Sequence, residues 1–256
     1  MTPRSFYLML AATAVVAGCR AKQPPAGAIV FQLSARHATG GDSAGPLVTT
    51  DTMLVHGRDT LFLHSVRIVL AELAIAPAVA NECEEEEGED NPPCVEFDDA
   101  PVVIDLPLGR GSVRRSARHA PATDYNLFQA VIHRPVSTAD TALLRANPDL
   151  AEASIRVEGT LSRGGRRRDF TFLSGFNEQE EITLEPVLTV ADGDSVHVTL
   201  RVDVASWFRG ADGKTLIDPA TAGLAGPHEA TVRDNIRTSL KVFRDANGDG
   251  IEDDQP

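Results

Sequence analysis

An alternating segment in the last third of the chain constrains the fold most strongly. Apolar side chains occupy every second position from Val196 to Val204, with polar side chains between them. This period of two predicts a half-buried β-strand, because successive side chains of a strand point to opposite faces. Turn signals such as Arg163-Gly-Gly-Arg166 and Ala191-Asp-Gly-Asp194 separate similar segments. We expect strands at 29–33, 53–55, 61–63, 66–75, 102–106, 125–132, 153–161, 169–173 and 182–190. The chain is therefore predicted to be mostly β, an antiparallel β-sandwich with one C-terminal α-helix.

The expected helix follows the last strand. From His228 onward, apolar residues recur near helical spacing, which predicts a stripe that lies on the sheet. We expect this helix to run directly into the acidic tail that begins near Asp245. A second, short helix is expected in a loop at 138–147. The apolar stripe consists of Val232, Ile236, Leu240 and Phe243.

The N-terminus has the pattern of a bacterial secretory signal. Arg4 supplies a positive charge, an apolar run extends from Leu8 to Val16, and small residues precede Cys19. The run is too short to be a permanent membrane span. Its ending, Val16-Ala17-Gly18-Cys19, resembles a lipobox. The resemblance implies cleavage before Cys19, a diacylglycerol group on its thiol and acylation (palmitate) of the new amine. The alternative is an ordinary signal peptide with a cysteine there by chance.

The lipobox resemblance also implies a location and a domain plan. Arg20, not Asp, follows the cysteine, which in the lipoprotein sorting pattern implies the outer membrane, on its periplasmic face or at the surface. We expect a signal peptide at 1–18 and a Pro-containing tether at 19–27. A sandwich domain with the C-terminal helix is expected at 28–243, followed by an acidic tail at 244–256.

The net charge of −13 disfavours two classes of partner. Nucleic-acid binding needs a basic face, so we expect no nucleic acid. The same charge disfavours docking on an anionic lipid surface, so the expected contact with the membrane is through the lipid anchor alone. With one Trp and two Tyr, the chain has few aromatic residues on which a sugar could stack, and no motif names a protein or glycan partner.

The three cysteines are expected to have two different roles. If Cys19 carries lipid, then Cys83 and Cys94 are left as a pair, which should form a disulfide in an oxidising compartment. Seven carboxylates lie between residues 82 and 90. This acidic segment is a solvated hairpin tip, a diffuse cation site or a docking site for a basic partner.

The tail contains the most specific chemical pattern. Residues 245–253 read D-x-N-x-D-G-x-x-D, which resembles part of an EF-hand calcium loop. By that resemblance the ligands are Asp245, Asn247, Asp249, the backbone carbonyl of Ile251, and Asp253. The pattern departs from the EF-hand at its twelfth position, where Pro256 stands in place of a bidentate carboxylate. We therefore expect either a weak calcium site or a solvated acidic tail.

Other site chemistry has little support in the sequence. The seven histidines show no H-x-H or H-x-x-x-H spacing, although a hairpin could bring His56 near His64. No G-x-S-x-G, H-E-x-x-H or phosphate-binding loop is present. The sequence thus predicts a protein that is not an enzyme.

The order of the elements resembles uncharacterised bacterial outer-membrane lipoproteins with an all-β domain of unknown function. The segments that carry this resemblance are 66–73, 102–108, 202–208, 216–219 and 235–239. The resemblance implies a membrane-anchored binding or envelope-structural module, without catalytic residues to transfer. The alternative is a periplasmic metal-handling protein that uses histidines and the acidic segment.

Overall fold

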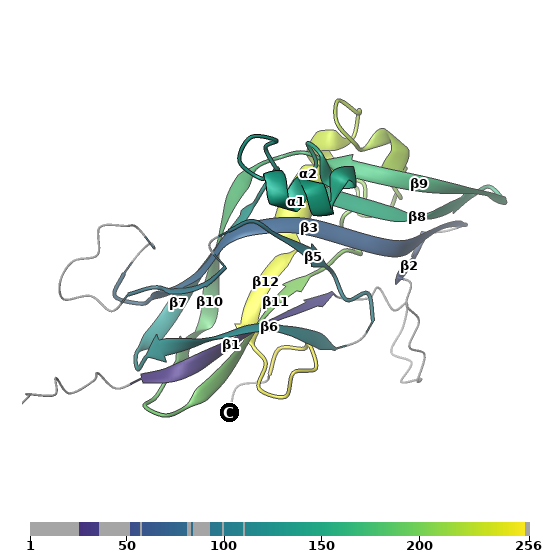
Figure 1. Ribbon diagram of the computed structural model, residues 1–256. Coiled ribbons are helices and arrows are strands. Elements are labelled where there is room, and N and C mark those ends of the chain that lie inside the picture. Colours follow the sequence, from purple (N-terminus) through teal and green to yellow (C-terminus); the bar gives the residue numbers. More distant parts are fainter. Residues whose placement is uncertain are drawn as a thin grey trace, which may run out of the picture.

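The computed structural model describes residues 26–35, 52–56, 58–80, 83, 93–98, 100–109 and 111–253. The fold within these residues is mostly β, as predicted, and its strands form two facing sheets (Figure 1). The strands are β1 (Ala26–Ala35), β2 (Thr52–His56), β3 (Asp59–Pro77), β4 (Val95–Asp98), β5 (Val102–Asp105), β6 (Ser112–Pro121), β7 (Asp124–Ile132), β8 (Ile155–Arg163), β9 (Arg166–Ser174), β10 (Glu178–Thr189), β11 (Ser195–Val202) and β12 (Leu240–Arg244).

The small sheet has the strand order β12-β11-β1-β6, and the large sheet follows the path β10-β7-β3-β8-β9. Strands β2, β4 and β5 also pair with β3. Ile68 of β3 lies between Ile155 of β8 and Ile104 of β5, so β5 flanks β3 on the side away from β8. The sandwich therefore has a side on which short strands of the large sheet approach β6.

The predicted antiparallel pairing of the strands is present, with one exception. The described strand pairs are antiparallel apart from β1 and β11, which run parallel with Ala28 opposite Ser195. Strands close in sequence pair as hairpins, but β1 and β11 are joined through most of the domain. Local sequence patterns carry no information about such a distant pairing.

Strand β3 is longer than expected because it combines two predicted strands. The hairpin of 53–55 with 61–63 is confirmed, with Leu54 opposite Leu61. The strand then continues without a break through 66–75, and it runs across the large sheet (Figure 1). Its residues Val66, Ile68 and Leu70 all lie in the core, as their alternation predicted.

An aromatic cluster links the two sheets in the core. Phe31 of β1 stacks on Phe97 of β4 with ring centroids 5.0 Å apart, and on Phe128 of β7 at 5.6 Å. All three rings are fully buried. Burying a side chain of this size contributes about 2 kcal/mol to the free energy of unfolding, so the cluster holds the sheets together.

The helices correct one prediction. The expected loop helix is α1 (Thr141–Ala146), and the C-terminal helix is α2 (Glu229–Thr238). Val232 and Ile236 are buried on α2, but Leu240 and Phe243 belong to β12. Ser239 ends the helix, and the next residues pair with β11 because that strand offers a free edge for backbone hydrogen bonds. No helix in the described ranges is long and apolar enough to span a bilayer.

Candidate functional site

The acidic tail folds back onto the outer face of the small sheet. Gln32 and Ser34 of β1 alternate with core residues and therefore face outward, and Thr199 of β11 lies directly opposite Gln32. None of the three is more than 4% exposed. Gly248 and Gly250 of the tail lie against Gln32 and Ser34, so the tail covers these polar side chains. We call residues 245–253 the tail loop.

Asp245 anchors the tail loop. Its side chain is fully buried, and its Oδ2 accepts hydrogen bonds from the Thr199 hydroxyl at 2.8 Å and from the Gly250 N–H at 2.9 Å. Its Oδ1 accepts from the Asp249 N–H at 3.1 Å. A buried carboxylate needs such partners, because an unpaired charge in the interior is strongly unfavourable. The first residue of the calcium-like pattern therefore also fixes the loop to the sheet.

The other predicted ligands fall into two groups. The Asn247 Oδ1 accepts from the same Asp249 N–H at 2.9 Å, and the Asn247 amide donates to the Asp249 Oδ2 at 3.1 Å. Asp245, Asn247 and Asp249 thus converge. Asp253 instead accepts from the Ala246 N–H at 2.6 Å and closes the base of the loop. The side chain of Ile251 is exposed, and its N–H donates to the Asp249 Oδ1 at 2.8 Å.

The sequence did not reveal how the sheet receives the tail loop. The Gln32 side chain bonds to the Nδ1 of His197 at 2.9 Å and accepts a hydrogen bond from the Ser112 hydroxyl. Ser112 also contacts the Gly248 carbonyl, at 2.8 Å. The available signal was Gln32, a polar residue that lies opposite Thr199 on the outer face of the sheet. It became meaningful only once β1 and β11 were known to be neighbours.

The setting of the tail loop differs from that of an EF-hand in two respects. A strand, β12, leads into it in place of the expected helix. In the part of the chain that the structure describes, no three His, Cys, Asp or Glu side chains are grouped so that they could hold a metal. The converging set contains only two carboxylates, because its third member is an asparagine. Pro256 lies outside the described residues.

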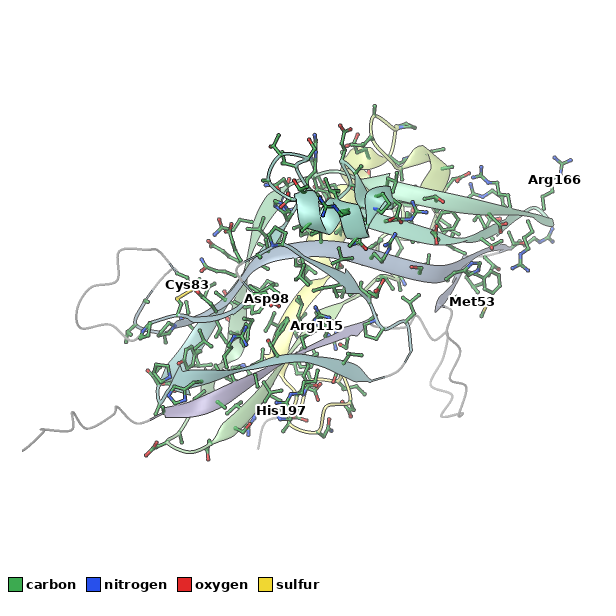
Figure 2. All side chains as sticks on the ribbon, in the orientation of Figure 1. Met53, Cys83, Asp98, Arg115, Arg166 and His197 are labelled. Carbon is green, nitrogen blue, oxygen red and sulfur yellow. A yellow bond between two sulfur atoms is a disulfide. The ribbon has the colours of Figure 1, made fainter. Side chains whose placement is uncertain are left out.

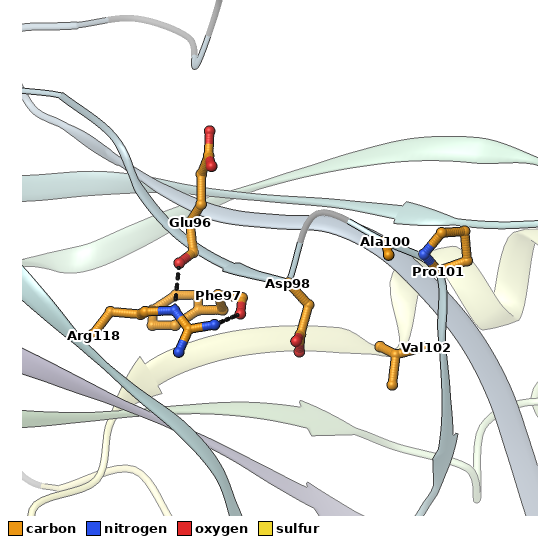
Figure 3. A pocket seen from close by; sticks show the side chains of 7 residues that line it. All are labelled: Glu96, Phe97, Asp98, Ala100, Pro101, Val102 and Arg118. Carbon is orange, nitrogen blue, oxygen red and sulfur yellow. Dashed lines mark hydrogen bonds between the residues drawn. The ribbon is translucent and has the colours of Figure 1, made fainter.

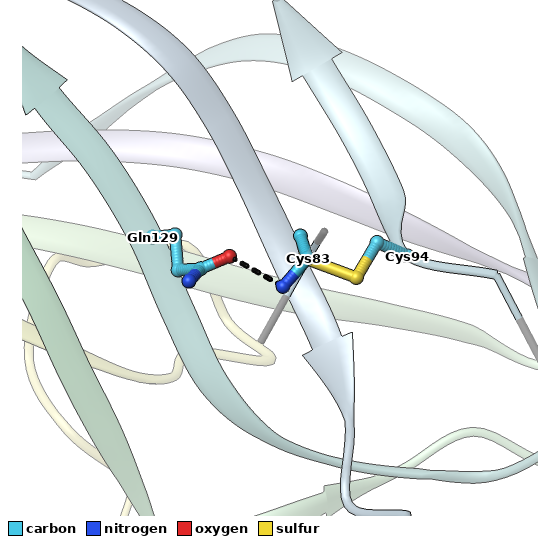
Figure 4. Close-up of a disulfide and its surroundings, with 3 residues drawn as sticks. All are labelled: Cys83, Cys94 and Gln129. Atoms are coloured by element: carbon cyan, nitrogen blue, oxygen red, sulfur yellow. Dashed lines mark hydrogen bonds between the residues drawn. A yellow bond between two sulfur atoms is a disulfide. The ribbon is translucent and has the colours of Figure 1, made fainter. Parts of the chain in front are cut away.

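The predicted disulfide is present. Cys83 and Cys94 are bonded with their Cα atoms 5.8 Å apart. Cys94 immediately precedes β4, which pairs with the end of β3, so the bond closes the base of the connection between these strands. The Cys83 N–H donates to the Gln129 side chain of β7 at 3.0 Å (Figure 4). The acidic residues 84–90 lie outside the described part, as does Glu82.

Among the described residues, no histidine belongs to a group of three side chains that could hold a metal. His197 bonds to Gln32, and His133 bonds to Asp140 at 2.9 Å. Strand register places His56 opposite Asp59, five residues before His64 on β3. Five residues of strand span roughly 17 Å, so the expected proximity of His56 and His64 is wrong. His37 and the side chain of His56 are not among the described parts.

One hydroxyl lies between a histidine and a carboxylate, as in a catalytic arrangement. The Thr160 Oγ1 is 3.4 Å from the Nε2 of His64 and donates to the Asp169 Oδ1 at 2.9 Å. Thr160 is fully buried. Its proton is directed at the carboxylate and not at the imidazole, and no substrate can reach the oxygen. The three residues therefore form a cross-strand hydrogen-bond row.

Three arginines near the turn of the β8–β9 hairpin have partners on the same molecule. Arg163 pairs with Asp59 at 2.7 Å, Arg168 pairs with Asp218, and Arg167 lies over the Phe62 ring at 5.7 Å. Arg166 is at the projecting tip (Figure 2). The turn expected at 163–166 is confirmed, and its residues are exposed. Among the described contacts, the ion pairs of residues 163–168 are to Asp59 and Asp218.

A pocket of about 540 Å³ opens between β4, β5 and β6 (Figure 3). Arg118 of β6 crosses its rim and donates to the backbone carbonyls of Glu96 at 3.0 Å and Phe97 at 2.5 Å. Asp98 and Val102 form other parts of the lining. Arg118 thus fastens the last strand of the small sheet to the large sheet.

No protein-family model matches the chain, and no curated protein matches it. Among solved structures, MbnP from Methylosinus trichosporium aligns with a TM-score of 0.42 and 12% sequence identity. The alignment covers 86% of this chain and 99% of that chain. The function has to be argued from the residues of this chain.

Proposed function

We propose that the chain is an outer-membrane lipoprotein, anchored through Cys19, whose sandwich is a non-catalytic binding or envelope-structural module. The lipobox pattern and the position of β1 support this proposal. The tether leads directly into β1, which lies between β6 and β11 and is hydrogen-bonded on both sides. A force on the anchor would therefore reach the middle of a sheet and not a fraying edge.

The anchor is tested by the intact mass of the protein purified from membranes. The expected N-terminal peptide begins at Cys19 and carries three acyl chains, and Cys19→Ser should leave the protein unacylated and outside the membrane fraction. Several acyl chains give stable anchoring, because each buried methylene contributes about 0.8 kcal/mol. An unmodified cysteine in the wild-type protein would refute the anchor.

We also propose that the tail loop binds calcium weakly. The observation that carries this proposal is the Asp249 N–H, which is shared by Asp245 and Asn247. Because the Oδ1 atoms of Asp245 and Asn247 both accept from this N–H, they lie close to each other. Ligands of a single ion must be close in the same way. With two carboxylates, one amide oxygen and a backbone carbonyl, the affinity should be in the roughly millimolar range of extracellular calcium modules.

Calorimetric titration of the mature protein with calcium tests this site. Asp249→Asn removes one ligand charge from an exposed side chain and keeps an oxygen that can accept from Ile251. Asp194→Asn, in the exposed turn before β11, is the matched control. Heat that is lost in the first variant and kept in the second supports the proposal. Binding that survives in both variants would move the site elsewhere, and no heat would leave a solvated acidic tail.

A further inference from the structure

Strand β6 carries a basic surface on a protein whose net charge is −13. The side chains of Arg114, Arg115 and His119 are exposed, and we call these three residues the basic row. Arg115 lies on β6 near the middle of the molecule (Figure 2). No carboxylate among the described residues forms an ion pair with either arginine of the row, whereas Arg67, Arg156 and Arg237 elsewhere are paired. The charge of the basic row is therefore available to a partner.

The register of the small sheet explains how these side chains are presented. Arg114 and His119 lie opposite Gln32 and Ala28, which alternate with core residues, so both face outward. Arg115 is the extra residue of a β-bulge, since the pairing skips from Arg114 to Ser116. Arg118 points to the other side and holds β6 to β4. The strand is thus fixed in place while the basic row stays free.

The position of β6 points to the membrane as the partner. Pro121 at the end of β6 lies opposite Ala26 at the start of β1. Cys19 precedes Ala26 by seven residues, a length of chain that reaches at most about 25 Å when extended. If Cys19 is acylated, this end of β6 cannot be farther than that from the lipid headgroups.

We propose that the basic row docks on the anionic phospholipid headgroups of the leaflet that carries the anchor. A lipid anchor combined with basic side chains is an established way to hold a protein against a bilayer. Each basic side chain near an anionic surface favours the docked orientation about fivefold. The inference rests on the proposed anchor. Docking would bring the β6 edge of the small sheet to the membrane, with the acidic tail loop beside the contact on the outer face of the sheet. The far end of the β8–β9 hairpin would be directed away from β6 (Figure 1).

The test uses the mature protein in vesicles of phosphatidylcholine, with or without phosphatidylglycerol. The readout is the rate at which diethylpyrocarbonate modifies His119, and exposed His228 at the start of α2 is the internal reference. EGTA is present throughout, because calcium bound at the tail loop could otherwise bridge to lipid phosphate. We expect His119, but not His228, to react several-fold more slowly on the anionic vesicles. Salt near 1 M, which shortens the screening length to about 3 Å, should abolish the difference.

The double variant Arg114→Gln, Arg115→Gln separates docking from mere proximity. Its His119 rate on anionic vesicles should return to within about twofold of the rate on neutral vesicles, given the contribution of each arginine. Arg145→Gln, an exposed arginine on α1, is the matched control and should behave as the wild type. Circular dichroism of both variants checks that the fold is intact.

The outcomes distinguish this proposal from the one on which it rests. An unacylated Cys19 in the same digest would overturn the anchor and the docking together. An acylated Cys19 with equal His119 rates on both kinds of vesicle would overturn the docking alone. Protection of His119 in native envelopes but not on vesicles would also overturn it, and would assign the basic row to an acidic protein partner.

Discussion

The hydroxyl of Thr199 donates a 2.8 Å hydrogen bond to the buried carboxylate of Asp245, and this contact joins the tail loop to the small sheet. Thr199→Val keeps the shape of the side chain but removes the donor. We expect the free energy of unfolding to fall by about 2 kcal/mol, because hydrogen bonds to charged groups are the stronger ones. Urea unfolding measures this loss. Exposed Thr171→Val on β9 is the control, and an equal effect of the two variants would refute the role of Thr199.

Replacing Gly250 with any larger residue is predicted to destabilise the protein, because there is no room for a side chain. Its φ is +77°, and a Cβ atom there would lie 2.9 Å from the Ser34 Cβ and 3.0 Å from the Gly111 carbonyl oxygen. Gly165 has nearly the same φ, +79°, but open space around it. Both alanine variants should lose about 1 kcal/mol through the left-handed backbone. Gly250→Ala should lose about 1–3 kcal/mol more through overpacking, and thermal unfolding would compare the two.

Removal of the disulfide should destabilise the protein moderately. Cys83 and Cys94 are 11 residues apart, so the bond closes a short loop. The variant Cys83→Ala, Cys94→Ala should lose about 2–3 kcal/mol of unfolding free energy, mainly because its unfolded chain is less restricted. A reductant should lower the stability of the wild-type protein by a similar amount and leave that of the variant unchanged. If the reductant left the stability of the wild-type protein unchanged, this expectation would be contradicted.

Arg237 on α2 should contribute more to the free energy of unfolding at neutral pH than in acid. Burial raises the pKa of the Glu180 carboxyl, while the Arg237 guanidinium, 3.0 Å away, acts to lower it. A carboxyl with a raised folded pKa contributes full stability below its unfolded pKa, about 4.3, and that stability is lost as pH rises through the folded value. Arg237→Met would raise this pKa further and so enlarge the loss at neutral pH.

The measurement for Arg237→Met is urea unfolding at pH 4 and at pH 7. We expect a loss of about 2 kcal/mol at pH 7, because a buried acceptor is left without its partner, and a smaller loss at pH 4. Exposed Arg134→Met is the control. Adding Glu180→Gln to Arg237→Met should restore part of the stability at pH 7. No recovery would show that Arg237 acts through packing or through its second partner, Glu178, and not through Glu180.

The strand pattern could be predicted wherever one face of a strand is buried. The β2–β3 hairpin and β11 follow directly from alternating apolar residues, and both formed as expected. Strand β6 was missed because its sequence, SVRRSARHAP, has almost no buried side chains: it is the last strand of its sheet. An edge strand is specified by its neighbour, β1, and not by its own hydrophobic pattern.

The tail loop was only partly predictable. Its ligand-type residues were identified from their spacing, and Asp245, Asn247 and Asp249 do converge. The helical spacing of Leu240 and Phe243 was misleading, because a stripe of apolar residues also suits a short strand. The partners Thr199, Gln32 and Ser112 come from three strands far apart in the sequence. No local pattern could place them beneath the loop.

The parallel pairing of β1 with β11 has a consequence for the biogenesis of the protein. If the chain is exported as proposed, its N-terminal end crosses the membrane first, so β1 emerges long before its parallel neighbour β11 (Ser195–Val202). Until β11 arrives, one edge of the apolar strand β1 is unpaired and open to pairing with other chains. The domain should therefore depend on a holding chaperone during secretion, and truncation before β11 should yield aggregates and not a smaller folded unit.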